Sequence, residues 1–367
     1  MSAEQSGDLT VDIGGDRTYP IRFVRNTGIV LTEIVRRHTE SKTAIALVTD
    51  LNLQLAHPSL FEEVLENVPT FVVSPGEPSK SLHRLGEIWD FLASIRMDRK
   101  GTVISLGGGV IGDLTGFAAA SFLRGVACYQ VPTTLLSMVD SSIGGKTGIN
   151  ISAGKNLVGA FYHPKEVLID TSFLETLPQV EFSAGMAEVV KYGLLGDLEL
   201  FERMESLDCL HPQHPELSTV IRRCCEIKAR VVKEDERENS AEGGRALLNL
   251  GHTYGHAVEQ VAGYGVYLHG EAVAIGMAAA VEMSRLKGWV SDEDVDRVIR
   301  ILKRYDLPVN LRFPLASIDL LDAMQRDKKV RQGIIRFVAM RGLGDTFTTR
   351  DIQEETVRES LAFIGAR

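Results

Sequence analysis

The chain has few cysteines and no long hydrophobic run. Its four cysteines, Cys128, Cys209, Cys224 and Cys225, show no Cys-x-x-Cys spacing and cannot form a disulfide framework for 367 residues. Reduced thiols and a cytoplasmic location are therefore expected. The most apolar run, Ala272–Val281, is too short to span a bilayer. Residues 1–10 are polar and lack the apolar core of a secretory signal.

Positive charge is also scarce, because 40 Lys and Arg face 49 Asp and Glu and the net charge is −9. This balance disfavours nucleic acid and anionic membranes as main partners. An anionic substrate would have to be held by a local cluster of basic side chains. The length favours two domains, and a composition of 44% hydrophobic and 24% charged residues is that of an ordinary globular protein.

A histidine-containing stretch from 245 to 271 is the most informative part of the sequence. His252 and His256 are four residues apart, so on the helix expected over Arg245–Ala262 both imidazoles project from one face. His269 and Glu188 are available as partners, and two histidines with a carboxylate form a metal site that keeps an open position. No Glu stands between the two histidines, which disfavours a zincin protease. The competing interpretation is a pair of hydrogen-bonded helix histidines without a metal.

The first half of the chain has the pattern of an α/β domain. A strand is expected at Tyr19–Val24, a short helix at Ile29–His38, and buried parallel strands at Thr43–Asp50, Thr70–Val73, Thr102–Leu106 and Val167–Thr171. The periodicity of 81–95 predicts a helix with Leu82, Leu85, Ile88, Trp89 and Leu92 on one side. Asp50 would lie at the carboxyl end of its strand, where an acidic residue can bind a ribose; the alternative is a solvated turn residue.

Two glycine-rich segments follow. Residues 107–112 satisfy Gly-x-Gly-x-x-Gly between a strand and a helix, which predicts a dinucleotide site, although two strand and helix pairs precede it and no acidic residue follows at the usual distance. Residues 141–148 resemble a Walker A loop but place Asp140 where its first glycine belongs. Lys146, in a loop expected to be flexible, and Lys155 are interpreted as point charges for phosphate or carboxylate, the alternative being solvated surface.

The second half is predicted to be helical. Helices are expected at Ser183–Leu195, Pro215–Glu236, Arg245–Ala262, Glu271–Lys287 and Asp292–Tyr305, and a β-ribbon at Ile334–Met340 after a basic segment, 327–333. We therefore predict an α/β domain over 1–172 and an α-helical domain over 173–367.

Taken together, these motifs resemble those of the 3-dehydroquinate synthase family of sugar-phosphate cyclases. The resemblance runs from about Asp50 to Lys329 and rests on Gly-Gly-Gly-Val-Ile-Gly-Asp, Phe-Leu-Arg-Gly, Pro-Thr-Thr-Leu-Leu, Asp-Ser-Ser-Ile-Gly-Gly-Lys-Thr-Gly-Ile-Asn, Gly-Lys-Asn-Leu-Val-Gly-Ala, Ala-Glu-Val-Val-Lys, Leu-Asn-Leu-Gly-His-Thr and His-Gly-Glu. It implies a Rossmann-like NAD-binding domain, a helical metal-binding domain, NAD, a zinc or cobalt ion and a homodimer. The implied reaction converts 3-deoxy-D-arabino-heptulosonate 7-phosphate, a sugar-phosphate acid, to 3-dehydroquinate and phosphate.

The resemblance also implies roles for individual residues. The implied metal ligands are Glu188, His252 and His269. The implied cofactor contacts are Asp50, Asn52, Glu77, Lys80, Gly109, Val110, Ile111, Gly112, Asp113, Thr133, Thr134, Asp140, Lys146, Lys155, Phe173, Leu174, Glu175 and Thr176. The implied substrate contacts are Arg124, Lys146, Asn156, Lys191, Lys228, Arg245, Asn249, His256 and one of Lys328 and Lys329.

Three other functions compete with this one. A metal-dependent polyol or alcohol dehydrogenase would share NAD and metal but would need no cluster of basic residues for phosphate. A sibling cyclase acting on a neutral sugar phosphate would be expected to lack Arg245 and Asn249, which suit a substrate carboxylate. A nucleotide-binding regulatory protein would not need functional residue types at every implied metal and cofactor position.

Overall fold

In the computed structural model, the described residues are 8–14, 17–238, 240, 243–329 and 335–367. Contacts within the chain divide it into two compact units. Unit 1 is Met1–Leu177 with Lys228–Lys233, and unit 2 is Pro178–Ile227 with Glu234–Arg367. The division predicted after residue 172 falls inside the 3-10 helix Thr171–Thr176 and stays a prediction. Each unit is described by itself.

A seven-stranded sheet forms the centre of unit 1, as described. Its strands, in the order in which they lie side by side, are β1 (Leu9–Asp12), β2 (Thr18–Phe23), β9 (Glu166–Ile169), β6 (Ala127–Pro132), β5 (Thr102–Gly107), β3 (Ile45–Asp50) and β4 (Thr70–Val73). All pairs are parallel except β1 with β2. Every residue of β5 is buried, as expected of a central strand covered on both faces.

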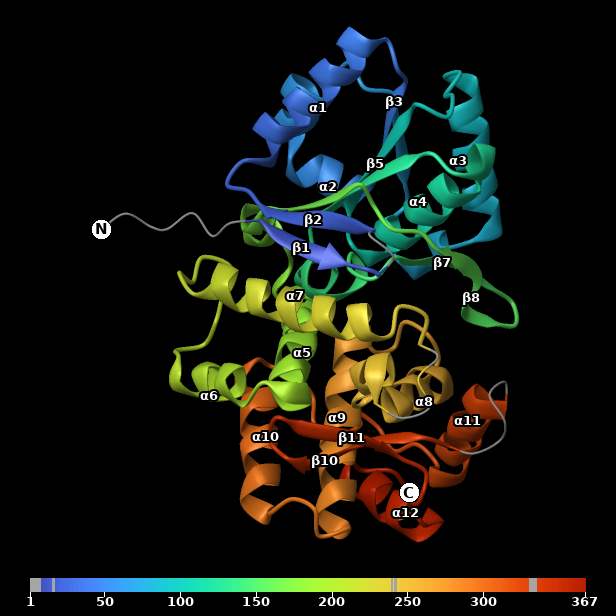
Figure 1. The fold of residues 1–367 in the computed structure, drawn as a ribbon. Coiled ribbons are helices and arrows are strands. Elements are labelled where there is room, and N and C mark those ends of the chain that lie inside the picture. The colour runs from blue at the N-terminus through green and yellow to red at the C-terminus, as the bar shows by residue number, and fades with distance from the viewer. Residues whose placement is uncertain (1–7, 15–16, 239, 241–242, 330–334) are drawn as a thin grey trace. The chain divides into compact units, whose positions relative to one another are not determined.

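Helices of unit 1 cover this sheet. They are α1 (Thr27–Ser41), α2 (Leu51–Ala56), α3 (Leu82–Ser94) and α4 (Gly109–Ser121). Figure 1 draws α3 and α4 on one side of β3 and β5 and α1 on the other. Leu85, Ile88 and Leu92 join a core cluster with strand residues such as Val103. Leu82, predicted to share their side of the helix, is instead 63% exposed because it begins α3, before the helix meets the core.

The strand order produces one switch point. The chain runs from β3 outward to β4 on one side, then returns to β5 and continues through β6 and β9 on the other. In parallel sheets of this kind, ligands bind beyond the carboxyl ends of the strands at the point where the order reverses. That point lies between β3 and β5, so the residues after Asp50 and Gly107 meet at one edge of the sheet.

A separate hairpin replaces the loop predicted around Lys146, which was wrong. Strands β7 (Lys146–Ile151) and β8 (Gly154–Phe161) pair antiparallel, so Lys146 starts a strand and Lys155 lies on its partner. The two backbones approach so closely that a Cβ on Gly159 would lie 2.0 Å from the carbonyl oxygen of Thr147. Gly148, which follows Lys146 on β7, is needed in the same way, because a Cβ there would lie 2.7 Å from the carbonyl oxygen of Val158.

Unit 2 is mostly helical. Its helices are α5 (Gln179–Gly196), α6 (Leu198–Ser206), the two ends of α7 (Leu217–Glu234), α8 (His252–Ala262), α9 (His269–Leu286), α10 (Asp292–Arg304), α11 (Ser317–Lys329) and α12 (Glu354–Phe363). Strands β10 (Phe337–Gly342) and β11 (Asp345–Thr349) form the expected ribbon. Its predicted start at Ile334, and residues 331–333 of the basic segment, lie outside the described residues.

The single helix predicted over Arg245–Ala262 was wrong. A 3-10 helix occupies Gly244–Asn249, and α8 begins only at His252. Gly251 separates the two with φ of 78°, a left-handed conformation that a glycine adopts without a steric penalty. This break sets where α8 begins and thereby the position of its first residue, His252.

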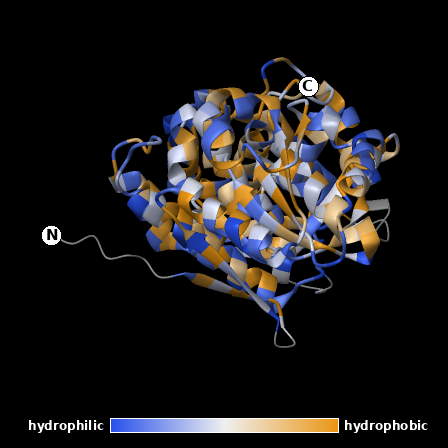
Figure 2. Cartoon of the chain, turned by 90° about the horizontal axis from the view of Figure 1, so that it is seen from above, coloured by the Kyte–Doolittle hydropathy of each residue, from blue (hydrophilic) through white to orange (hydrophobic). Residues whose placement is uncertain are grey.

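Among the described helices, none combines the length and the apolar character needed to cross a membrane. In Figure 2 the helices carry hydrophilic as well as hydrophobic residues.

Candidate metal and nucleotide sites

Three side chains from three helices of unit 2 meet at one point. Glu188 lies on α5, His252 begins α8 and His269 begins α9, and one ligand atom from each lies within 4.8 Å of the others. Glu188 is buried, with 1% of its side chain exposed. The structure thus brings together the three residues proposed as metal ligands.

Close helix packing through glycines makes this convergence possible. A Cβ on Gly270 would lie 1.9 Å from the carbonyl oxygen of Ala184, one turn before Glu188 on α5. A Cβ on Gly276 would lie 2.0 Å from the carbonyl oxygen of Gly251. Helices α5, α8 and α9 therefore approach with backbone against backbone, which larger residues would prevent.

Both histidines use one ring nitrogen for orientation. His252 Nδ1 lies 3.2 Å from the carbonyl oxygen of Leu250, and His269 Nδ1 lies 3.4 Å from a carboxylate oxygen of Glu259. A ring nitrogen held in this way sets the tautomer and leaves Nε2 for a metal. His252 Nε2 lies 3.6 Å from Glu188 Oε1, close to the spacing of two ligands of one ion.

The protonation state of the donor groups suits a metal at this point. Burial, together with the nearby Lys191 cation, lowers the pKa of His252 well below its usual value, so its imidazole is neutral and able to bind a metal. Neither carboxylate oxygen of Glu188 has a hydrogen-bond partner of normal geometry, although Lys191 Nζ forms an ion pair with Oε2. A buried carboxylate with this unused bonding capacity beside two imidazoles fits a divalent metal of the zinc class.

Other predicted contacts of unit 2 lie in the same helices and the 3-10 segment. His256 is one turn after His252, with the ring centroids 5.5 Å apart. A guanidinium nitrogen of Arg245 donates to the carbonyl oxygen of Glu236 at 2.7 Å, and Asn249 donates to Glu238 at 3.2 Å. Lys328 and Lys329 end α11, and their side chains lie outside the described part of the structure.

In unit 1, several predicted cofactor residues lie at or just after the carboxyl ends of the parallel strands. Asp50 ends β3 and caps α2 by accepting from the amide of Leu53 at 3.1 Å. The glycine motif joins β5 to α4, whose N-cap Gly108 offers no side chain to its first amide groups. Thr133 and Thr134 follow β6. An uncapped helix N-terminus at a sheet switch point fits the pyrophosphate of a dinucleotide.

Lys80 connects two of these segments. It is 4% exposed, and its ammonium group donates to Asp113 on α4 at 2.7 Å and to Asn156 on β8 at 2.6 Å. Burial raises the pKa of Asp113, and Lys80 partly offsets that effect. A predicted substrate contact, Asn156, is therefore held beside two predicted cofactor contacts.

The remaining predicted residues of unit 1 form smaller groups. Lys228 donates to Asp140 Oδ1 at 2.7 Å and also contacts the Asp140 carbonyl oxygen. Arg124 is exposed in a strained turn with φ of 64°. Phe173, Leu174, Glu175 and Thr176 belong to the 3-10 helix after β9, where Thr176 Oγ1 lies 2.8 Å from His57 Nε2.

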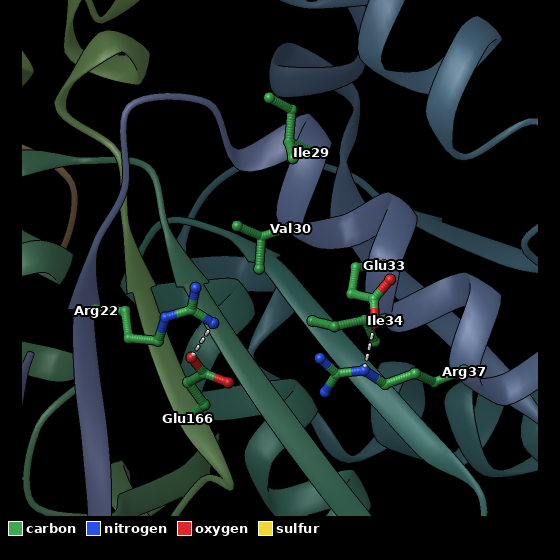
Figure 3. A pocket seen from close by; sticks show the side chains of 7 residues that line it. All are labelled: Arg22, Ile29, Val30, Glu33, Ile34, Arg37 and Glu166. Carbon is green, nitrogen blue, oxygen red and sulfur yellow. Dashed lines mark hydrogen bonds and ion pairs between the residues drawn. The ribbon is translucent and has the colours of Figure 1, made fainter.

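The hollows on the described surface of unit 1 include the following pair. One of about 200 Å³ is lined by Arg22 and Arg37 with their ion-pair partners, and Figure 3 shows Ile29, Val30 and Ile34 beside them. None of its lining residues is a predicted site residue. The other, of about 470 Å³, includes Asp170, Ser172, Phe173 and His57.

Two residues that sequence reasoning passed over touch these sites. Glu259 contacts His269, and its place three residues after His256 on one helix face was the available signal. Asn150 bonds both Glu77 and Asn156, and its place at the end of the Lys-Thr-Gly-Ile-Asn motif was the available signal.

Comparisons with known proteins agree over most of the chain. Residues 70–184 match the family described as 3-dehydroquinate synthase N-terminal, and residues 185–330 match the one described as 3-dehydroquinate synthase C-terminal. A 3-dehydroquinate synthase of Opitutus terrae is 54% identical over 98% of this chain and 99% of its own length. One from Pseudoalteromonas atlantica is 43% identical over 96% and 99%.

Solved structures of other proteins share the fold of this chain. A 2-epi-5-epi-valiolone synthase from Streptomyces hygroscopicus, solved with NAD+ and Zn2+ bound, is 26% identical with a TM-score of 0.86 and covers 96% of this chain and 98% of its own. An NADH-dependent butanol dehydrogenase from Thermotoga maritima has a TM-score of 0.63 at 16% identity, with 95% and 96% covered, and shares the fold.

Proposed function

The chain belongs to the 3-dehydroquinate synthase family, and we propose how its own residues carry the reaction of that family. The reaction converts 3-deoxy-D-arabino-heptulosonate 7-phosphate to 3-dehydroquinate and phosphate by transient oxidation, phosphate elimination, reduction and intramolecular aldol closure. NAD and a divalent metal are its cofactors. Zinc suits two imidazoles and a carboxylate, and cobalt suits them equally well.

Glu188, His252 and His269 would hold the metal. When bound, the metal would supply Lewis acidity at the substrate hydroxyls, and NAD would supply reversible hydride transfer. The neutral state of His252 supports this role, because a protonated imidazole could not bind a cation. Lys191 compensates the charge of Glu188 within the same buried cluster.

We assign NAD binding to the residues at the switch point of the unit 1 sheet. The amide groups at the start of α4 would bind the pyrophosphate, and Asp50 would bind a ribose hydroxyl. Lys80 keeps Asp113 in place beside them.

The basic residues would bind the acidic groups of the substrate. Lys146, Arg124 and Lys228 are assigned to the phosphate, where positive charge stabilises its departure. Arg245 and Asn249 are assigned to the carboxylate, since a guanidinium fork matches its two oxygens. His256 is assigned to proton transfer, because an imidazole can both accept and donate a proton.

The observation that carries this proposal is the convergence of Glu188, His252 and His269 beside a buried lysine. The test measures phosphate released from 3-deoxy-D-arabino-heptulosonate 7-phosphate with catalytic NAD, beside chelator-treated protein and a His252→Ala variant. We expect stoichiometric phosphate and 3-dehydroquinate without net NADH, and loss of both in the two controls. Steady NADH formation from simple polyols without phosphate release would assign the chain to the dehydrogenases.

A homodimer and a cytoplasmic location complete the proposal. Support for the location comes from four free cysteines, of which Cys128, Cys224 and Cys225 are buried. Light scattering after size-exclusion chromatography would measure the mass, which for a dimer is twice the 40.3 kDa of one chain.

A further inference from the structure

An irregularity in the β7–β8 hairpin frees one residue from strand pairing. The register of the pair shifts between Ile149 and Ile151, so Asn150 has no regular partner on β8. Its backbone amide donates instead to the carbonyl oxygen of Lys80 at 2.8 Å. Three residues of β8, 155–157, lie opposite this one residue of β7, so the ladder is interrupted there. Asn150 bridges instead to Ser81, next to the loop that holds Glu77 and Lys80.

The side chain of Asn150 bonds in two directions. Its amide nitrogen donates to Glu77 Oε1 at 2.7 Å, and its amide oxygen accepts from the backbone amide of Asn156 at 2.9 Å. Both bonds require a side chain that is as long as asparagine and carries both a donor and an acceptor. Aspartate has no donor, and alanine has neither group.

The second bond supports an unusual backbone conformation. Asn156 has φ of 55°, a left-handed conformation that asparagine adopts more readily than most residues and that local hydrogen bonds stabilise. Its side chain in turn accepts from Lys80, which also bonds Asp113. Glu77, Asn150, Asn156, Lys80 and Asp113 thus form one continuous hydrogen-bonded chain from the hairpin to the first turns of α4.

We propose that Asn150 is a positioning residue that holds the cofactor residue Glu77 and the substrate residue Asn156 in register with each other. The inference rests on the proposed function, because it takes the roles of Glu77 and Asn156 from it. Loss of Asn150 releases Glu77 from its orientation and removes the bond that keeps Asn156 left-handed. NAD affinity and substrate affinity therefore fall together, while the metal cluster of unit 2 is unaffected.

The test uses the full-length zinc-loaded protein and the variants Asn150→Ala and Asn150→Asp. For Asn150→Ala we expect the NAD Kd, measured by calorimetry without substrate, to rise about 10-fold, the effect of one lost hydrogen bond to a charged group. KM for the sugar phosphate at saturating NAD rises by a similar factor, with little change in kcat. Asn150→Asp raises the NAD Kd further, because it sets a carboxylate against Glu77 at hydrogen-bond distance.

A double-mutant cycle with Glu77→Ala separates positioning from general damage. If Asn150 acts on NAD through Glu77, the Asn150→Ala change has little effect on the NAD Kd once Glu77 is gone. Asn310→Ala is the matched control, because its amide donates to a backbone carbonyl, that of Phe363, in unit 2. Its NAD Kd and KM should equal those of the unchanged protein.

Several results would overturn the inference. One is an NAD Kd and a KM unchanged in Asn150→Ala. Another is a parallel loss of kcat, zinc affinity and melting temperature, which would indicate a merely structural residue. If Asn150→Ala does not fold, Asn150→Asp with an unaltered NAD Kd is equally decisive. Failure of the unchanged protein to bind NAD would instead refute the proposed function, and the two failures are therefore distinguishable.

Discussion

His252 and His269 present the same ring nitrogen to different acceptors. The acceptor is a neutral carbonyl for His252 and the buried carboxylate of Glu259 for His269. A carboxylate partner makes an imidazole a more basic metal ligand and fixes its ring. We therefore expect metal affinity to depend more on the contact between His269 and Glu259 than on the contact between His252 and Leu250.

Replacing Glu259 tests that difference. We expect Glu259→Gln to weaken zinc affinity about 10- to 100-fold, because the orienting charge is lost while all three ligands remain. Chelator competition measures the affinity, and the absorption spectrum of the cobalt-loaded protein reports the ligand set. Glu282→Gln, which removes another buried carboxylate of unit 2 that pairs with Arg285, should leave both unchanged. Equal zinc affinity in the two variants would contradict the orienting role of Glu259.

The cysteines differ in their exposure to reagents. Burial raises the pKa of Cys128 to about 12 and that of Cys224 well above its usual value, and Cys225 is also buried. Cys209 is exposed, although its thiol donates to the carbonyl oxygen of Arg304. In a native titration at pH 8 with a disulfide reagent, one thiol should react quickly and three only after unfolding. Two or more fast thiols, or a fast thiol retained in Cys209→Ser, would show this burial pattern to be wrong.

At the scale of elements, the sequence predicted strands and helices better than their boundaries and breaks. The buried strand Thr102–Leu106 was confirmed because a continuous apolar run closed by glycines has few other solutions. The break at Gly251 was missed because glycine is compatible with a helix pattern, and only packing against α9 requires its left-handed turn. Lys146 was assigned to a loop because glycines flank it in the sequence. The pairing of β7 with β8, which makes it part of a strand, has no signature in the local sequence.

The site shows the same division between local and long-range information. The metal triad was proposed from residue types, yet its convergence depends on α5, α8 and α9 meeting through glycines. Spacing along one helix favoured His252 with His256, whereas the described triad combines His252 with Glu188 and His269 from two other helices. Contacts between different helices are set by tertiary packing, and the hydrophobic periodicity of the sequence does not predict them.

Helix packing itself can be tested at Gly276. An alanine there would place its Cβ 2.0 Å from a backbone carbonyl of Gly251, so α8 and α9 must separate. We expect a loss of about 2–3 kcal/mol in the free energy of unfolding and weaker zinc binding. Urea denaturation measures the first quantity. Gly86→Ala on α3, where a Cβ meets nothing within 4 Å, should instead stabilise the protein by up to about 1 kcal/mol. A neutral Gly276→Ala would disprove the tight contact.

At the scale of the whole molecule, the two cofactors are assigned to different units. Hydrogen exchange should therefore show zinc, added without NAD, slowing the amides around Glu188, His252 and His269. NAD should slow those around Gly107–Asp113 even after chelation, because a ligand at 100 times its Kd stabilises the bound state by about 2.7 kcal/mol. Zinc protection confined to unit 1 peptides would contradict the assignment of the metal to unit 2.

The short segment Lys228–Lys233 belongs to unit 1, although the residues on both sides of it belong to unit 2. Lys228 bonds Asp140 at 2.7 Å, and Lys233 pairs with Asp12 at 2.9 Å. During synthesis, these two acidic residues leave the ribosome long before their partners. The first unit cannot complete its contacts until position 233 has emerged, by which time only residues 178–227 of the second unit have left the ribosome. The first unit must therefore wait for a segment that follows the start of the second, and no single cut of the gene would yield both as intact fragments.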